Sequence, residues 1–343
     1  MLSGVVGHEK VKKVLASSFV GNRVGHAYIF EGPKGVGRLT AAKAFSKLLL
    51  CENPQDSNAC GACKSCKMCE SGNHPDMVVV TNQLYDQSKK STDVLVDTIR
   101  NMKKDIFIKP YLSGRKIYII PKADTMNMYA QNSLLKVLEE PPEYCTIILI
   151  AENTNMFLPT IISRAVPVKF FPVSVQEVCD YIRKAYPEKA DSLSAIAAMS
   201  GGCIGRAKLL CESQDMLGIR TKLISLIDAL CETKKSSIYD LMVFLKQNKD
   251  ETRLVWDIMQ SLFCDLMYIK KTESAEKITN SDKTAELEKI AGRIYADTPA
   301  KLLEVLIKYS DYILKNISYA QIAQCMSLEF WEAIHDRSYR CEI

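Results

Sequence analysis

The feature that most constrains the fold is a short apolar run that ends in a glycine-rich loop and continues into a helix. His26-Ala27-Tyr28-Ile29-Phe30 is typical of a buried strand, and residues 40–50 carry alanine and leucine at helical spacing. Further short apolar runs alternate with helical patterns; the strands are expected at 77–80, 116–120 and 146–150, and the helices at 9–20, 92–104 and 127–140. Such alternation predicts a parallel sheet covered on both faces, and so an α/β domain.

The pattern changes at Phe171-Pro172, after which no strand is expected. Ser174 and Glu177 have the spacing of a capping box at a helix start. Short helices broken at Pro187 and Gly201-Gly202 follow, and from Ile219 the apolar spacing is helical throughout, with a polar loop at 272–283. The sequence therefore predicts three parts: an α/β front (1–171), a small helical middle (172–212) and an all-helical rear (213–343).

Charge and hydropathy exclude some classes of protein without naming a partner. The 343 residues carry a net charge of only +5, which is too small for a histone-like binder of nucleic acid. No apolar run approaches the roughly 18 residues of a membrane helix, and the N-terminal sequence becomes charged too early for a signal peptide. We therefore expect a cytoplasmic protein with no membrane partner.

The glycine loop lies where a phosphate-binding loop belongs, between a strand and a helix. Gly32, Gly35 and Gly37 supply its glycines, but Arg38 stands where the pattern needs lysine, and Leu39 where it needs a hydroxyl for Mg²⁺. Thr40 comes one residue too late. The loop therefore has the shape of a nucleotide site without its side chains.

The second element of a phosphate-transfer site is a strand that ends in carboxylates. The strand at 116–120 ends instead in Pro121 and Lys122. We interpret the front domain as a degenerate ATPase that hydrolyses no ATP, and leave open whether ATP or ADP still binds. The alternative is an ordinary glycine turn in a fold that never bound nucleotide.

Five cysteines fall between residues 51 and 69. Cys51, Cys60, Cys63 and Cys66 have the short spacing of a closed tetrahedral Zn²⁺ site, so structural zinc is the predicted cofactor. Cys69 or His74 could replace a ligand, although His74 is better explained as a turn residue before the next strand. An iron–sulfur cluster and a disulfide are the alternatives, and the eight cysteines from 145 to 341 are expected to be reduced thiols of the core.

Two arginines remain, Arg164 in Ser163-Arg164-Ala165 and Arg206 in Gly205-Arg206-Ala207. An isolated arginine is usually a solvated or salt-bridged surface group. Taken alone, neither supports a functional assignment.

In this order, the motifs resemble the clamp-loader ATPases of the AAA+ class in bacterial DNA polymerase III. The resemblance covers residues 1 to about 210 and rests on the strand and loop at 26–40, the cysteine insertion, Gly72-Asn73-His74-Pro75-Asp76, residues 134–142 and residues 158–164. It implies an AAA+ domain (1–171) with a zinc module (51–69), a helical lid (172–212) and a C-terminal helical collar for oligomerisation (213–343).

The resemblance further implies a ring that loads a sliding clamp onto primed DNA during replication, as part of a DNA-directed DNA polymerase holoenzyme. Arg38, Leu39, Pro121 and Lys122 place the chain with the family's non-hydrolysing member, whose partners are gamma or tau and delta subunits. The family's arginine finger, which acts on the neighbouring subunit's ATP, maps onto Arg164, although Ala165 departs from the family motif. Arg206 matches a nucleotide-sensing arginine, for which we expect a structural role here.

Two rival hypotheses stay open. The chain is an active gamma- or tau-like ATPase if Arg38 and Leu39 support turnover of Mg-ATP. It is a stand-alone zinc-dependent DNA-binding protein if Lys64, Lys67, Lys89 and Lys90 near the cysteines contact DNA.

Overall fold

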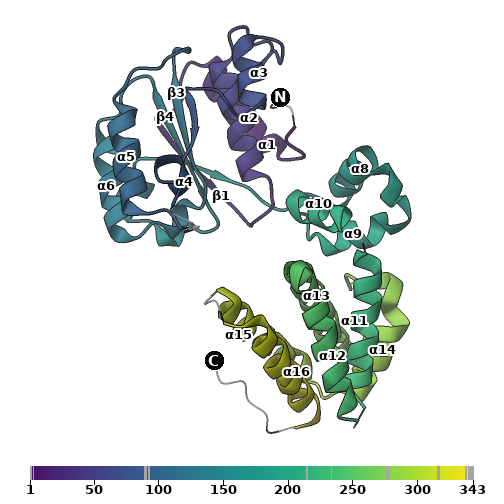
Figure 1. The fold of residues 1–343 in the computed structure, drawn as a ribbon. Coiled ribbons are helices and arrows are strands. Elements are labelled where there is room, and N and C mark those ends of the chain that lie inside the picture. Colours follow the sequence, from purple (N-terminus) through teal and green to yellow (C-terminus); the bar gives the residue numbers. More distant parts are fainter. Residues whose placement is uncertain are drawn as a thin grey trace. The chain divides into compact units, whose positions relative to one another are not determined.

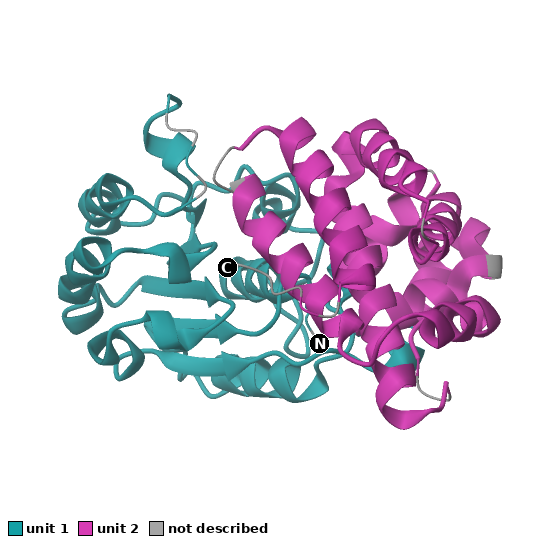
Figure 2. Cartoon of the chain, turned by 90° about the horizontal axis from the view of Figure 1, so that it is seen from below, with its two compact units in different colours: residues 1–178, 202–205 teal, residues 179–201, 206–343 magenta. Residues whose placement is uncertain are grey.

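The computed structural model describes residues 2, 4–88, 91, 93–213, 215–232, 234–275, 278–314, 317–336 and 338. The chain forms two compact units, one of residues 1–178 with 202–205 and one of residues 179–201 with 206–343 (Figure 2). The first unit contains a parallel sheet, and the second is built from helices (Figure 1). The division into three domains stays a prediction.

The sheet has five parallel strands in the order β2-β3-β4-β1-β5. Their bounds are β1 Ala27–Glu31, β2 Met77–Val79, β3 Lys116–Ile120, β4 Cys145–Ala151 and β5 Val166–Lys169. Successive side chains point to opposite faces of the sheet, so each central strand feeds two cores. In β4, for example, Ile148 lies in one core and Leu149 in the other.

Helices cover both faces of this sheet (Figure 1). Residues of α1 and α2 fill the core on one face, and residues of α5 and α6 fill the core on the other. The helices of this unit are α1 Glu9–Val20, α2 Arg38–Leu50, α3 Lys64–Glu70, α4 Asn82–Tyr85, α5 Val96–Ile106, α6 Met128–Glu139 and α7 Pro159–Ile162. The predicted α/β class is confirmed.

The remaining helices are α8 Val175–Ala185, α9 Leu193–Met199, α10 Ile204–Glu212, α11 Met216–Leu230, α12 Ser236–Gln247, α13 Thr252–Thr272, α14 Thr284–Arg293, α15 Thr298–Leu314 and α16 Tyr319–His335. The predicted capping box is present: Ser174 N–H donates to Glu177 Oε2 at 2.8 Å, and Glu177 N–H donates to Ser174 Oγ at 3.3 Å. In the second unit, the loop after α13 is held by the buried Asp265 carboxylate, which accepts the N–H groups of Thr279 and Asn280 at 2.8 Å each. No helix of the described residues is long and apolar enough to cross a bilayer.

Several predicted details were wrong. The fifth strand, β5, and the short helix α3 inside the cysteine region were not foreseen. The helix expected from residue 92 begins at Val96, and residue 92 itself lies outside the described residues. Cys264 and Cys325 are exposed rather than core thiols, and Cys341 lies outside the described residues.

Candidate functional site

The glycine loop leads from β1 into α2 and requires glycine at both ends. At Gly32, an added Cβ would lie 2.4 Å from the carbonyl oxygen of Phe170, so no side chain fits. Gly37 caps α2 with φ 111°, a left-handed conformation that other residues adopt only with strain. The backbone therefore keeps the form of a phosphate loop.

Arg38, at the first position of α2, turns into the end of the sheet and is 8% exposed. Its guanidinium lies 4.0 Å from the carboxylate of Glu152, which directly follows β4. Burial lowers the pKa of Arg38, while the charges of Glu152 and Asp124 oppose that shift. Asp124 in turn accepts the backbone N–H of Glu152 at 2.7 Å. Arg38 stands where a phosphate-binding loop has its cationic side chain, but here that side chain faces two carboxylates of its own chain.

Other residues of the first unit form hydrogen bonds with backbone carbonyl groups of the glycine loop. The His8 ring nitrogen Nε2 donates to the carbonyl of Val36 at 2.9 Å, and its ring contacts Phe170 edge to face. Gly205 N–H donates to the carbonyl of Gly35 at 2.7 Å, and an added Cβ on Gly205 would lie 2.9 Å from Gly35 Cα. Two neighbouring segments therefore hold the loop closely.

The other positions of the predicted nucleotide site do not fit Mg-ATP chemistry. Leu39 and Thr40 are exposed on the outer side of α2, and Leu39 offers no oxygen to a metal. Pro121 and Lys122 follow β3 directly, and Lys122 has a left-handed backbone at φ 52°. The structure thus brings Gly32, Gly35, Gly37 and Arg38 together without a metal-binding hydroxyl or a carboxylate pair directly after β3.

The cysteine cluster lies at the other end of α2. Cys51 follows the helix directly, Cys60 and Cys63 come from the next loop, and Cys66 lies in α3. Their four sulfur atoms lie within 4.8 Å of one another, and the sulfurs of Cys60 and Cys66 are 3.9 Å apart. Zn–S bonds of about 2.3 Å in a tetrahedron place sulfurs about 3.8 Å apart, so the four residues fit a metal ion such as zinc.

Backbone N–H groups point at these sulfurs, as thiolate ligands require. Cys60 N–H donates to Cys51 Sγ at 3.2 Å, Cys63 N–H to Cys60 Sγ at 3.4 Å, and Cys66 N–H to Cys63 Sγ at 3.3 Å. The N–H groups of Cys63 and Ala62 lower the pKa of Cys60 to about 6. Burial raises the pKa of Cys51 and Cys66. Cys60 therefore ionises more readily than Cys51 and Cys66, and binding of a metal requires the thiolate form of its ligands.

Neither alternative ligand belongs to the cluster. Cys69 is buried beside it, and burial raises its pKa to about 11. His74 is buried and forms hydrogen bonds on both ring nitrogens, with Asp76 N–H at 3.1 Å and Ser65 Oγ at 2.8 Å. The interpretation of His74 as a turn residue is confirmed, but its link to Ser65 in the cysteine module was not foreseen.

The two arginines lie in different units. Arg164 follows α7, is about one third exposed, and pairs with Glu139 of α6 at 3.2 Å while donating to the carbonyl of Thr160 at 3.0 Å. Arg206 of α10 lies 3.5 Å from the carboxylate of Asp257 and donates to the Asp257 carbonyl at 3.2 Å, beside a cavity of about 180 Å³. Arg206 is thus held within its own unit.

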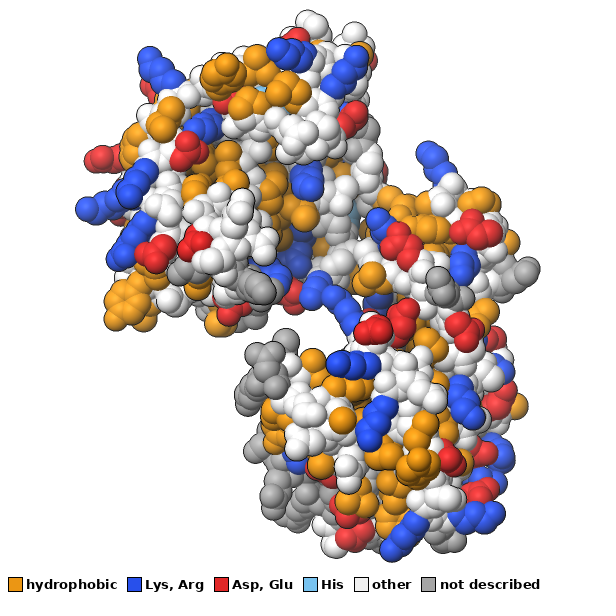
Figure 3. All heavy atoms as spheres, in the orientation of Figure 1, with side chains coloured by type: hydrophobic (Ala, Val, Ile, Leu, Met, Phe, Trp, Pro, Cys, Tyr) orange, Lys and Arg blue, Asp and Glu red, His pale blue; other side chains and the backbone are white. Residues whose placement is uncertain are grey.

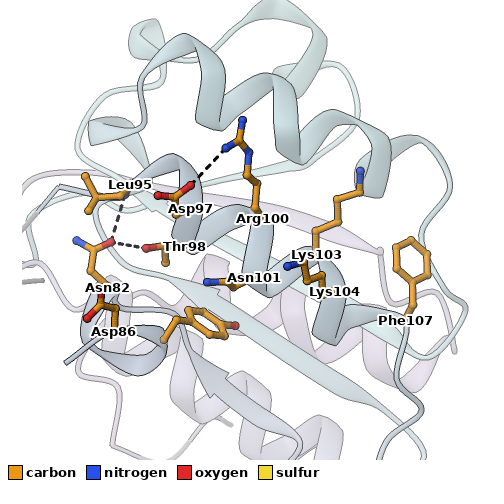
Figure 4. A pocket seen from close by; sticks show the side chains of 11 residues that line it. Asn82, Asp86, Leu95, Asp97, Thr98, Arg100, Asn101, Lys103, Lys104 and Phe107 are labelled. Atoms are coloured by element: carbon orange, nitrogen blue, oxygen red, sulfur yellow. Dashed lines mark hydrogen bonds and ion pairs between the residues drawn. The ribbon is translucent and has the colours of Figure 1, made fainter. Parts of the chain in front are cut away.

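A groove of about 770 Å³ lies along α4 and α5 (Figure 4). Helix α5 covers the face of the sheet opposite α2. Lys103 and Lys104 line the groove, and neither pairs with a carboxylate among the described residues, whereas Arg100 pairs with Asp97 at 3.3 Å. On the face drawn in Figure 3, basic and acidic side chains are interspersed over much of the surface. Lys89 and Lys90 lie outside the described residues.

Two families of known proteins match this chain, one over its front part and one over its rear part. The family described as "DNA polymerase III, delta subunit" matches residues 7–174, and the one described as "DNA polymerase III, delta subunit, C terminal" matches residues 214–320. These matches, with the parallel sheet and its glycine loop, define the class: a clamp-loader subunit of DNA polymerase III with the AAA+ fold.

Two relatives define the group more closely. The chain is 31% identical to the DNA polymerase III subunit delta' of Bacillus subtilis, with 80% of this chain and 79% of that protein covered. It is 30% identical to the delta' subunit of Pseudomonas aeruginosa, with 70% of each covered. The chain belongs to the family of DNA polymerase III delta' subunits.

Other relatives in this family carry different names. The chain is 28% identical to the tau subunit of Bacillus subtilis over 89% of its own length, and it spans about half (56%) of that longer protein. The solved structure of a gamma subunit-related protein from Thermotoga maritima aligns with 95% of this chain and 99% of its own, at 16% identity and a TM-score of 0.44. The family assignment rests on the sequence relatives alone.

Proposed function

We propose that this chain is a non-hydrolysing subunit of a clamp-loader complex that helps to load a sliding clamp onto primed DNA. The observation that carries the proposal is Arg38, which is buried and faces Glu152 and Asp124 where an ATPase would present a free lysine to phosphate. Leu39, Pro121 and Lys122 add no group that binds Mg²⁺ or activates water. The partners would be tau or gamma and delta subunits, with the clamp and DNA reached through the complex.

Arg164 is the residue through which such a subunit would act on catalysis. An arginine supplied from outside an ATP site stabilises the charge that develops on the transferring phosphoryl group. Arg164 is partly exposed at the edge of the first unit, and its ion pair with the exposed Glu139 is weak enough to be exchanged for a phosphate. We therefore assign it a trans-acting role, and Arg206 a structural one.

Zinc is the proposed metal at Cys51, Cys60, Cys63 and Cys66. Four thiolates complete a tetrahedral shell and leave no position for a reacting water, so the role of the ion is structural. It would tie the residue after α2 to α3 and fix the loop between them.

The rear helices, residues 213–343, are proposed to mediate assembly. Tyr239, Ile307 and Leu328 expose apolar side chains on three helices of the second unit. Replacing Ile307 and Leu328 by aspartate should lower incorporation into the reconstituted complex, which analytical size exclusion measures. Incorporation at wild-type level would contradict this role.

The decisive test of the whole proposal is a comparison of two ATPase measurements. The isolated chain should show no turnover with or without primed DNA, while a complex reconstituted with tau or gamma and delta subunits should turn over ATP and load the clamp. Steady turnover by the isolated chain would favour the rival gamma- or tau-like ATPase. Tight DNA binding by the isolated chain, without assembly, would favour the stand-alone zinc protein.

A further inference from the structure

A buried chain of hydrogen bonds connects the cysteine module to a surface loop on the first unit. The loop, residues 107–115, lies between α5 and β3 and exposes Phe107, Ile108 and Tyr111, the last at 87%. His74 and Asp76, in the turn before β2, lie between the module and this loop and are 3% and 1% exposed. Neither residue takes part in the glycine loop or in the set of four sulfurs.

Asp76 holds the loop by its backbone. Its two carboxylate oxygens accept the N–H groups of Tyr111 at 2.6 Å and of Leu112 and Ser113 at 2.8 Å each. A buried carboxylate needs such donors, since an unpaired charge in the interior is costly. Three consecutive amides therefore have one shared acceptor, and the conformation of the loop depends on where Asp76 is held.

His74 connects Asp76 to the cysteine module. Its Nδ1 accepts the N–H of Asp76 at 3.1 Å, so the proton of the neutral ring is on Nε2. Nε2 then donates to Ser65 Oγ at 2.8 Å, and Ser65 donates to the carbonyl of Leu50 at 2.7 Å. Ser113 Oγ lies 3.3 Å from the same Nε2, so the ring touches the loop as well.

Ser65 lies within the segment that carries the metal ligands. It lies between Cys63 and Cys66, and its N–H donates to Glu52, the residue after Cys51, at 3.1 Å. A metal held by the four sulfurs fixes both segments that hold Ser65. Without it, the two segments lose the anchor that the four sulfurs share, because such modules depend on the metal for much of their fold.

We infer that Ser65, His74 and Asp76 form a relay through which metal binding at the four cysteines orders the surface loop 107–115. The inference rests on the proposed zinc site and goes beyond it, since it assigns the module an effect on a surface that it does not itself form. His74 and Asp76 are positioning residues. Coupling of this kind is reciprocal, so a break in the relay must also weaken the binding of the metal.

The test measures hydrogen exchange in residues 107–115 of the full chain, before and after removal of zinc with a chelator. In the wild type, zinc removal should speed exchange of the Tyr111, Leu112 and Ser113 amides by about fivefold or more. In His74→Asn, the amide oxygen can still accept the Asp76 N–H, but the side chain is too short to reach Ser65. That variant should exchange fast even with zinc bound and respond little to its removal.

Zinc affinity gives the second measurement. His74→Asn and Ser65→Ala should each bind zinc about fivefold or more weakly in competition with a chromogenic chelator, by the same factor that each loses in loop protection. His74→Gln, which can still donate to Ser65, should retain most of the affinity. Ser71→Ala is the matched control, because Ser71 lies just after α3 and its side-chain hydroxyl donates to the Met68 carbonyl at 3.1 Å at the surface.

The outcomes separate the two proposals. A purified chain without zinc overturns the metal assignment. A chain that binds zinc but whose loop protection is unchanged by chelation overturns the relay, and so does a folded His74→Asn variant with wild-type zinc affinity. If His74→Asn does not fold, Ser65→Ala decides by the same two measurements.

Discussion

The two ends of α2 offer a comparison within one chain. Before the helix, the glycine loop keeps its backbone form but has Arg38 and Leu39 where nucleotide chemistry needs a lysine and a hydroxyl. After the helix, the cysteine module has all four sulfurs of a metal site in place. The glycine loop is held by backbone contacts with Phe170 and Gly205, so its shape does not need the missing side chains. In the module, the residues that would bind the metal also lie in the segments that the metal would hold together.

The largest expected effect concerns Arg164, the residue that we propose acts on the ATP site of a neighbouring subunit. Replacing Arg164 with Ala in the reconstituted complex should slow the neighbouring ATP site by about a thousandfold, because the guanidinium stabilises the phosphoryl transition state. Total ATPase would fall less if other sites are intact, and clamp loading should fall more. Glu139→Gln, which only frees Arg164 from its ion pair, is the control. Unchanged ATPase and loading with Arg164→Ala would leave the subunit as a passive spacer.

The cysteine module is tested by removing one of its four proposed metal ligands. Cys63→Ser should weaken zinc binding by about a hundredfold or more, because one of four thiolates is lost from a site that supplies much of the local folding energy. Elemental analysis after dialysis should find one zinc per wild-type chain and little in the variant. Cys69→Ser, next to the site but outside the four sulfurs, should retain the metal. Full occupancy in Cys63→Ser would show that the ligand set is wrong.

A smaller effect, on DNA binding by the complex, is expected from the two lysines of the groove on α5. This groove is separate from both the glycine loop and the cysteine module. Lys103→Ala with Lys104→Ala should weaken association of the complex with primed DNA and reduce its salt dependence by about one unit of slope for each lysine that contacts a phosphate. Lys10→Ala, exposed on α1 at the opposite face of the sheet, should change neither. An unchanged salt slope in the double variant would show that Lys103 and Lys104 do not contact DNA phosphates.

The smallest effect is expected at Arg38. Arg38→Ala should leave the ATPase of the isolated chain at background and lower the free energy of unfolding by about 1 kcal/mol, since its ion-pair partner Glu152 is largely exposed. Chemical denaturation and a coupled ATPase assay measure the two quantities. If the isolated wild-type chain hydrolyses ATP and Arg38→Ala abolishes that activity, the glycine loop is a working ATP site and the difference between the two ends of α2 does not hold.

The sequence predicted those elements whose apolar pattern is continuous. The strand at 116–120 and the helix at 9–20 were placed at their observed bounds, because every residue of that strand is buried and the helix has one apolar face. β5 was not predicted, because it is an edge strand that contains Pro167 and in which only Val168 is buried. Helix α3 was not predicted either, because two of its seven residues are cysteines and the sequence analysis assigned them to the metal-binding segment.

The candidate site was predictable only where its residues are close in the sequence. The cysteine spacing names the four sulfurs that the structure brings together. The contact of Arg38 with Glu152 depends on β1 and β4 being neighbours in the sheet, which no local pattern encodes. The same holds for the bonds from Asp76 to residues 111–113, which span more than thirty residues.

The strand order also has a consequence for synthesis on the ribosome. β1 pairs with β4 on one side and β5 on the other, so Ala27 meets Ile147, a residue made about 120 positions later. At about 5–20 residues per second, roughly 6–25 seconds pass between translation of the two. During that interval, an apolar strand that ends up inside the sheet, between β4 and β5, has both edges unpaired. Of the five strands, β1 therefore waits longest for its neighbours and is the segment of the nascent first unit most in need of protection by a chaperone.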